Sequence, residues 1–177
     1  MTLKLIYYFK PSILTGYAAT SMYNVVGGGT NVLCMNKDPL LSENITSVIK
    51  DSIRGIEYNF LNVPFITGEN CDQILNGGDR PCVVCHVETR SHQVMIPGVD
   101  NCPAGWTLEY YGFLVSSLIS QQKMDYTCLD KSPETVPNGV PDAVSRYVYP
   151  VEAVCGGSLP CPPYISGYGI PCVVCSK

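Results

Sequence analysis

Two copies of one cysteine motif carry the most evident chemistry in this chain. Pro81-Cys82-Val83-Val84-Cys85 returns letter for letter as Pro171-Cys172-Val173-Val174-Cys175. Cysteines at this spacing can bind a metal, attach haem, exchange disulfides with a redox partner, or form structural disulfides. The residues around each copy indicate which of these uses applies.

Haem attachment is suggested by the first copy only. It is followed by His86, which completes a Cys-x-x-Cys-His pattern, and Met95 is a candidate axial ligand. The second copy has Ser176 at the position of His86, and no helical pattern of a haem pocket surrounds either motif. We therefore expect no haem and no other cofactor.

Zinc binding and thiol exchange also fit the surroundings poorly. The two Cys-x-x-Cys pairs lie far apart, and the other cysteines outnumber them. A redox centre needs the motif at the start of a helix in a βαβ unit, whereas here it follows proline in strand-forming Val-Val. The chain has ten cysteines, an even number that indicates structural disulfides and an oxidising compartment. We expect no bound metal.

The two histidines, His86 and His92, suggest a third kind of site. On one strand they would share a face with Glu88, which could bind a metal or act in acid–base chemistry. We favour a plain polar strand face that also carries Arg90. No nucleophile elbow, zinc-protease or calcium-loop pattern occurs, so the sequence predicts a non-enzymatic protein without catalytic residues.

The elements that position these residues are predicted to be strands. Charged residues make up 15% of the 177 residues, and the chain has 12 tyrosines, 16 glycines and 14 prolines, a mixture that favours strands and turns. A net charge of −4 without a basic cluster gives no electrostatic basis for nucleic-acid binding. No apolar run approaches the ~18 residues of a membrane span.

One segment departs from the β pattern. Its apolar residues recur at helical spacing, at Leu41, Ile45, Val48, Ile49 and Ile53. Ser42 can cap the start and Gly55 follows the end. The sequence therefore predicts one short helix near residues 42–54 in a chain that is otherwise mostly all-β.

Three consecutive glycines, Gly27 to Gly29, could suggest a phosphate-binding loop. Such a loop needs a following helix and a lysine or hydroxyl residue at set positions, and neither is present. We interpret them as a flexible hairpin turn.

The cysteine motif closes each copy of a longer repeat. Gly112-Phe113 matches Gly16-Tyr17, and the segment 126–133 matches 32–39. Similar intervals separate Cys34 from Cys82 and Cys128 from Cys172. The sequence thus predicts one domain, residues 1–177, with two tandem homologous β-rich halves at 1–98 and 99–177.

These motifs resemble a known family. The run Val94-Met95-Ile96-Pro97, Cys102-Pro103-Ala104-Gly105-Trp106 and Gly112-Phe113, with Ile66-Thr67-Gly68-Glu69-Asn70 in the first half, resembles the noncollagenous C-terminal domain of type IV collagen. The resemblance is closer still to the same domain of short-chain, spongin-type collagens, through Lys37-Asp38-Pro39, the segment 157–164 and the terminal Cys-x-x-Cys-Ser-Lys.

The resemblance implies an extracellular domain that associates with copies of itself, since such domains drive trimerisation in type IV collagen. The chain has no Gly-X-Y triplets and so no triple helix of its own. We expect a secreted structural protein of the extracellular matrix, whose partners are itself or other matrix proteins. The alternative is a soluble, lectin-like recognition module on the same scaffold, with a glycan as ligand.

The resemblance also implies the disulfide pairing. The pairs carried over are Cys102–Cys175, Cys128–Cys172 and Cys155–Cys161 in the second half, and Cys34–Cys82 in the first. The first half has no counterpart of Cys102 and instead contains Cys71. We infer that Cys71 pairs with Cys85.

Secretion is supported by the cysteines but not by the first residues. Met1 to Tyr8 is too short and too aromatic for a signal peptide and has no cleavage site. Either a leader is missing from this sequence or the compartment inference is wrong, and we give the cysteines more weight. Asn44-Ile45-Thr46 makes Asn44 a glycosylation candidate, as in a secreted glycoprotein.

Overall fold

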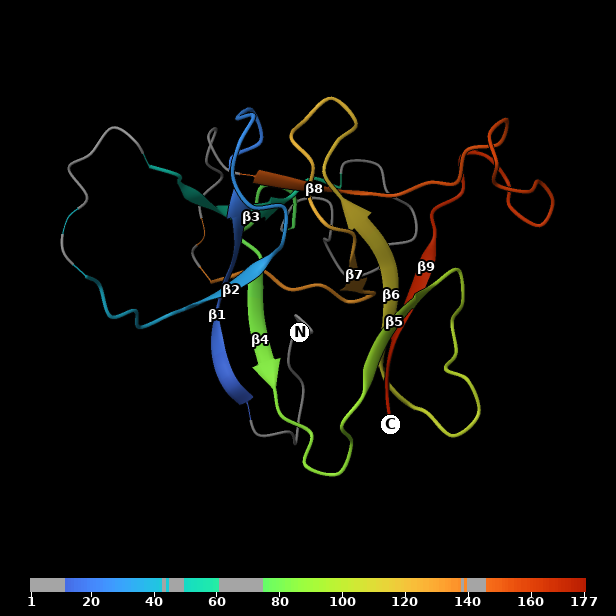
Figure 1. The fold of residues 1–177 in the computed structure, drawn as a ribbon, viewed down its shortest axis with the longest axis horizontal. Coiled ribbons are helices and arrows are strands. Elements are labelled where there is room, and N and C mark those ends of the chain that lie inside the picture. The colour runs from blue at the N-terminus through green and yellow to red at the C-terminus, as the bar shows by residue number, and fades with distance from the viewer. Residues whose placement is uncertain (1–11, 43, 45–49, 61–74, 138, 140–145) are drawn as a thin grey trace.

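All regular structure in the described part of the chain is β-strand (Figure 1). The computed structural model describes residues 12–42, 44, 50–60, 75–137, 139 and 146–177. The strands are β1 (Ser12–Ser21), β2 (Leu33–Asn36), β3 (Ile53–Tyr58), β4 (Pro81–Cys85), β5 (Gln93–Pro97), β6 (Thr107–Ser116), β7 (Thr127–Asp130), β8 (Arg146–Pro150) and β9 (Pro171–Ser176). The all-β prediction is confirmed for these residues, which contain no helix able to cross a membrane.

The strands form one mixed sheet in the order β2-β1-β3-β8-β6-β9-β5, with β4 paired to β1 and β7 to β6. Every strand pair is antiparallel except β3 with β8, where Glu57 lies opposite Tyr147 in a parallel ladder. That parallel pair joins a group of strands around β1 to a group around β6. The two groups lie on opposite sides of the view in Figure 1.

The two groups pair in the same way. β1 pairs with β2, β3 and β4, and β6 pairs with β7, β8 and β9. Gly16 lies opposite both Asn36 and Cys82, and Gly112 lies opposite both Asp130 and Cys172. β5 pairs with β9. By its hydrogen bonds β5 therefore belongs to the group around β6, although it lies within residues 1–98, the predicted first half.

A glycine at the centre of each group allows an unusually close strand contact. A Cβ atom placed on Gly16 would lie 1.6 Å from the carbonyl oxygen of Met35, and one on Gly112 would lie 1.6 Å from that of Leu129. Real Cβ atoms do not approach backbone so closely, so no other residue fits either position. This explains why the repeated Gly-aromatic pair begins with glycine.

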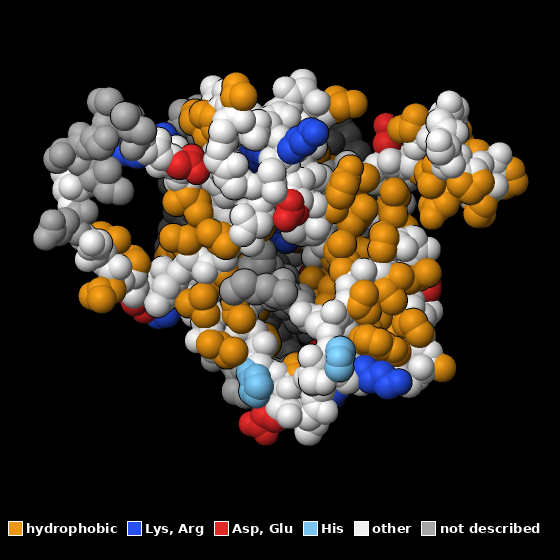
Figure 2. Space-filling model, viewed as in Figure 1, with side chains coloured by type: hydrophobic (Ala, Val, Ile, Leu, Met, Phe, Trp, Pro, Cys, Tyr) orange, Lys and Arg blue, Asp and Glu red, His pale blue; other side chains and the backbone are white. Residues whose placement is uncertain are grey.

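The main hydrophobic core lies between the two groups. Its buried members come from strands of both groups, including β3 and β8, and from the neighbouring connections: Ala18, Cys34, Ile56, Tyr58, Phe60, Leu75, Cys82, Val115, Met124, Leu129 and Val148. A smaller cluster on the group around β6 contains Tyr110, Cys128, Cys172 and Val174, with Met95 packed against it. Other hydrophobic side chains remain at the surface over both groups (Figure 2).

The predicted helix near 42–54 is wrong where the structure describes it. Ile53 and Arg54 belong to β3 and lie opposite Ser21 and Thr20 of β1. Residues 41, 42, 44 and 50–52 have no regular structure, and 43 and 45–49 lie outside the described residues. β3 pairs with β1 on one side and β8 on the other, and this pairing outweighs the local helical periodicity.

Substituting alanine for Gly112 should destabilise the protein severely, by more than about 3 kcal/mol, because the added Cβ collides with backbone rather than with a movable side chain. Urea unfolding followed by circular dichroism measures the effect. Gly55→Ala in β3 is the matched control: it has open space around it and should change stability by less than about 1 kcal/mol. Equal effects of the two substitutions would contradict the close-contact explanation.

Candidate functional site

The cysteines among the described residues form four disulfides, which are the same four pairs that the resemblance implied. They are Cys34–Cys82, Cys102–Cys175, Cys128–Cys172 and Cys155–Cys161. Cys34–Cys82 and Cys128–Cys172 each link two strands that pair with the same central strand. Cys102–Cys175 links the connection before β6 to β9, and Cys155–Cys161 closes a short surface loop. Four disulfides indicate an extracellular or otherwise oxidising environment.

Two of these disulfides span the face of a central strand. Cys34 of β2 and Cys82 of β4 lie on opposite edges of β1, yet their Cα atoms are 5.7 Å apart. In a flat sheet two strands separated by a third lie about 9–10 Å apart. β2 therefore folds over the face of β1, at the position where Gly16 has no side chain. Cys128 and Cys172 repeat this arrangement across β6, with a Cα distance of 5.8 Å.

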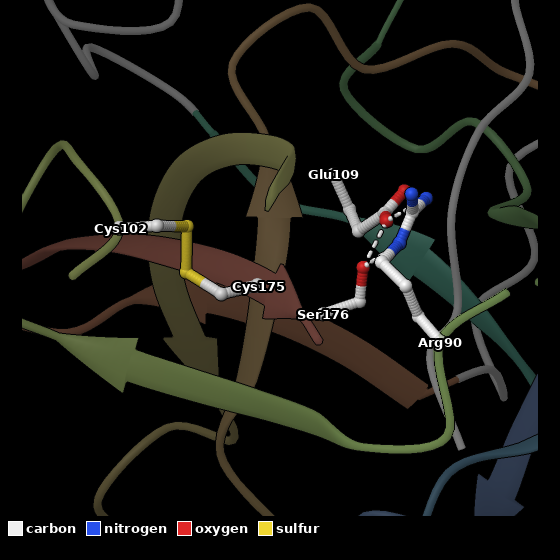
Figure 3. The surroundings of a disulfide bond; sticks show 5 residues. All are labelled: Arg90, Cys102, Glu109, Cys175 and Ser176. Atoms are coloured by element: carbon white, nitrogen blue, oxygen red, sulfur yellow. Dashed lines mark hydrogen bonds and ion pairs between the residues drawn. A yellow bond between two sulfur atoms is a disulfide. The ribbon is translucent and has the colours of Figure 1, made fainter. Parts of the chain in front are cut away.

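The Cys102–Cys175 disulfide lies beside a polar cluster (Figure 3). Arg90 donates through Nε to Ser176 Oγ at 2.7 Å and through Nη2 to Glu109 Oε1 at 3.0 Å. Ser176 Oγ also donates to the Glu109 carboxylate, whose side chain is 5% exposed. Because the serine proton is held by the carboxylate and its oxygen by the guanidinium, the cluster attaches the end of β9 to β6. Sequence reasoning missed it because the three residues lie far apart in the chain.

Cys85 has no disulfide partner among the described residues. It is half-buried at the end of β4, opposite Ser12. The matching cysteine of β9, Cys175, is bonded to Cys102. Cys71 lies outside the described residues, so its pairing with Cys85 stays a prediction.

The two histidines do not share a strand face. β4 ends before His86 and β5 begins after His92, so residues 86–92 form a connection with a turn, and the expected strand face is wrong. The main chain of His92 pairs with Lys177, and its Nδ1 lies 2.9 Å from Ser91 Oγ. The described residues contain no group of three or more side chains that could hold a metal.

The other predicted site residue, Asn44, is exposed in the connection between β2 and β3, where a glycan could be attached. Met95, considered above as a haem ligand, instead packs against the cluster of Tyr110, Cys128, Cys172 and Val174.

An apolar groove of about 360 Å³ opens over this same cluster, and no pattern in the sequence indicated it. Its lining residues come from β2, β5, β6, β7 and β9: Asn31, Val32, Leu33, Met95, Tyr110, Asp125, Tyr126, Thr127, Cys128 and Val174. At the groove the Tyr110 hydroxyl donates to the Cys128 carbonyl oxygen at 3.0 Å. Burial raises the pKa of Tyr110 far above its usual value, so this phenol remains a hydrogen-bond donor.

Comparison of the chain with protein-family models, curated proteins and solved structures found no match.

We predict that the native protein contains no free thiol. An oxidising compartment leaves an unpaired Cys85 exposed to reaction, and the ten cysteines allow complete pairing. Mass mapping of the unreduced protein should find a peptide that joins Cys71 to Cys85. A thiol reagent that labels Cys85 in the unreduced protein would show that the inferred pair does not form.

We also predict that stability falls as pH rises above about 10. Burial raises the pKa of Tyr58 and Tyr110, with a smaller opposing effect of Arg80. The unfolded chain loses these two protons near pH 10 while the folded protein keeps them, so alkali favours unfolding. Urea unfolding at pH 8 and pH 10.5 measures the difference.

Tyr58→Phe provides the control for this pH dependence. The Tyr58 hydroxyl is buried without a hydrogen-bond partner among the described residues, so its removal should not destabilise the protein at pH 8. The variant should lose less stability between the two pH values than the unsubstituted protein. An equal loss would mean that Tyr58 does not contribute.

Proposed function

We propose that the protein is a secreted, non-enzymatic structural protein that self-associates head to tail in an extracellular assembly. The proposal includes the tandem repeat: the groups around β1 and β6 are homologous halves of one domain. The matching registers of Gly16 and Gly112 support this, as does the sequence repeat.

Each half has two unlike sides. We call the side that carries the disulfide across the central strand the disulfide side, and the other the outer side. In the first half the disulfide side includes Ala18, Cys34 and Cys82, and the outer side includes Tyr17 and Met35, since neighbouring residues of a strand face opposite ways.

Within the chain, the disulfide side of the first half meets the outer side of the second half. Ala18, Cys34 and Cys82 belong to the same core cluster as Val115 and Leu129. Cys128 lies opposite Leu114, so both residues belong to the disulfide side. Leu129 and Val115 are the next residues along β7 and β6, and they therefore lie on the outer side. Unlike sides therefore pack against each other inside the chain.

The outer side of the first half is then exposed, whereas the disulfide side of the second half keeps a groove beside the buried Tyr110 and Val174. Met35, the counterpart of Leu129, is 39% exposed where Leu129 is 2% exposed, and Tyr17 beside it is 45% exposed. On the second half the disulfide side carries the 360 Å³ groove at Met95, Tyr110 and Val174. The contrast between Met35 and Leu129 is the observation that carries the proposal.

These two open surfaces are suited to a second copy of the chain. The outer side of one copy would cover the disulfide side of the next, and so repeat between chains the packing found within the chain. A contact between unlike surfaces closes into a ring or continues as a filament. An assembly through low-charge, aromatic surfaces fits the composition.

An extracellular location is supported by the four disulfides and the exposed sequon at Asn44. The resemblance to collagen C-terminal domains adds matrix proteins as a second class of partner. It adds no triple helix within this chain, since the sequence has no Gly-X-Y triplets.

Light scattering after size exclusion tests the assembly. At micromolar concentration the protein should have a mass that is a multiple of 19.3 kDa, and Met35→Glu or Met95→Glu should lower it to the monomer, since each buries a charge in the contact. Ile119→Glu, at a fully exposed apolar residue, is the control and should keep the assembly.

Mixing the two variants tests the head-to-tail geometry. Each keeps one intact surface, so an equal mixture of Met35→Glu and Met95→Glu should form one-to-one dimers and nothing larger. A contact between identical surfaces would give no such rescue. A monomeric unsubstituted protein would contradict self-association altogether.

A further inference from the structure

The end of β1 and the starts of β2 and β3 form a second pocket, of about 330 Å³, which is lined by both polar and apolar groups. Its lining residues are Thr20, Ser21, Gly29, Asn31, Leu33, Asp51, Ser52 and Ile53. β1 lies between the other two strands here, with Ala19 opposite both Leu33 and Gly55. The pocket is therefore built on paired strand ends.

The hydroxyl groups of Thr20 and Ser21 are held in fixed directions. Their residues are 2% and 4% exposed, and the hydroxyls donate to the carbonyl oxygens of Asn31 at 2.9 Å and Gly29 at 2.7 Å. A hydroxyl that donates its proton keeps lone pairs that accept hydrogen bonds. These two oxygens are therefore oriented acceptors at the pocket.

The three consecutive glycines close over this part of the pocket. Gly28 has φ +94°, and a Cβ atom placed there would lie 2.2 Å from Ser21 Oγ and 3.1 Å from Asp51 Oδ1. Only glycine permits both this conformation and this contact. The interpretation of Gly27 to Gly29 as a turn holds, but the glycines also bring the turn against the wall of the pocket.

The exposed walls combine polar and apolar groups. Asn31, Asp51 and Ser52 are exposed, and Asp51 Oδ1 accepts the main-chain N–H of Ser52 at 2.7 Å, which fixes the direction of the carboxylate. Leu33 and Ile53 are 38% and 44% exposed beside them. Among the described residues that line the pocket, Asp51 is the charged one.

We propose that this pocket binds one uncharged sugar residue of a glycan. A carboxylate, an amide and hydroxyl acceptors match the vicinal hydroxyls of a pyranose ring, and the exposed faces of Leu33 and Ile53 match its apolar C–H face. The volume lies at the low end for ligand pockets and suits a single ring. The negative charge of Asp51 disfavours acidic sugars.

This inference does not depend on self-association. Leu33 lines both the pocket and the apolar groove, but the residues substituted to test the two proposals are different. A glycan ligand would let the same chain attach an assembly to carbohydrate, or act as the recognition module considered above.

Titration of the full chain with the methyl glycosides of glucose, galactose, mannose and N-acetylglucosamine tests the site, with amide chemical shifts as the readout. At least one glycoside should bind saturably at millimolar concentration and shift the amides of Ser21, Asn31 and Ser52. The methyl glycoside of sialic acid should not bind. No saturable shift at these amides with any of the four neutral sugars would overturn the proposal.

Two variants locate the binding. Asp51→Asn removes the charged acceptor at an exposed position and should weaken the best glycoside about tenfold or more. Asp38→Asn is the matched control, at an exposed aspartate whose ion pair is with Lys37 rather than with the pocket, and should leave the affinity unchanged. Unaltered affinity in Asp51→Asn would place the sugar elsewhere and reject the assignment.

Discussion

The fold depends on a strand that crosses over another strand at a glycine. β2 lies across the face of β1 at Gly16, and β7 across that of β6 at Gly112, so close that a Cβ atom would overlap the crossing backbone. Each crossing brings a cysteine of the crossing strand within reach of one on the far edge, at Cα distances of 5.7 and 5.8 Å. The glycine and the disulfide are two parts of one constraint, because neither geometry is available without the other.

The covalent links then stabilise a chain that has few charged residues and long connections. The loops closed by Cys34–Cys82 and Cys128–Cys172 span 48 and 44 residues. In the chain-entropy treatment each such loop contributes about 4 kcal/mol by restricting the unfolded chain. That is comparable with the ~5–15 kcal/mol net stability of a whole domain. The disulfides thus give a structural use to Cys82, Cys172 and Cys175 of the repeated Cys-x-x-Cys.

The crossings also decide which surfaces are exposed. Because each strand group carries the disulfide across its central strand on one side only, its two sides are unlike, and unlike sides of the two groups meet in the main core. The exposed side with Met35 and the groove at Met95 and Val174 support the proposed head-to-tail assembly. The pocket at Asp51 lies where β1 extends beyond its crossing with β2, so the same architecture provides the proposed sugar site.

Much of this was determined by the sequence alone. The duplicated Pro-Cys-Val-Val-Cys predicts the strands β4 and β9, and residue types with turn signals predict an all-β chain, since these patterns depend on neighbours in the sequence. The four disulfides followed from the resemblance, through cysteine order and spacing. The tertiary structure decided the strand pairing, the burial and the pockets that depend on residues far apart in the sequence. Ile53 and Arg54 became strand because they pair with Ser21 and Thr20 of β1, while the following residues of β3 pair with β8. Met35 and Leu129 occupy matching positions, yet only Leu129 is buried, because Leu129 packs in the core between the two strand groups. Gly28 covers a pocket only because Ser21 and Asp51, distant in sequence, meet at the end of β1.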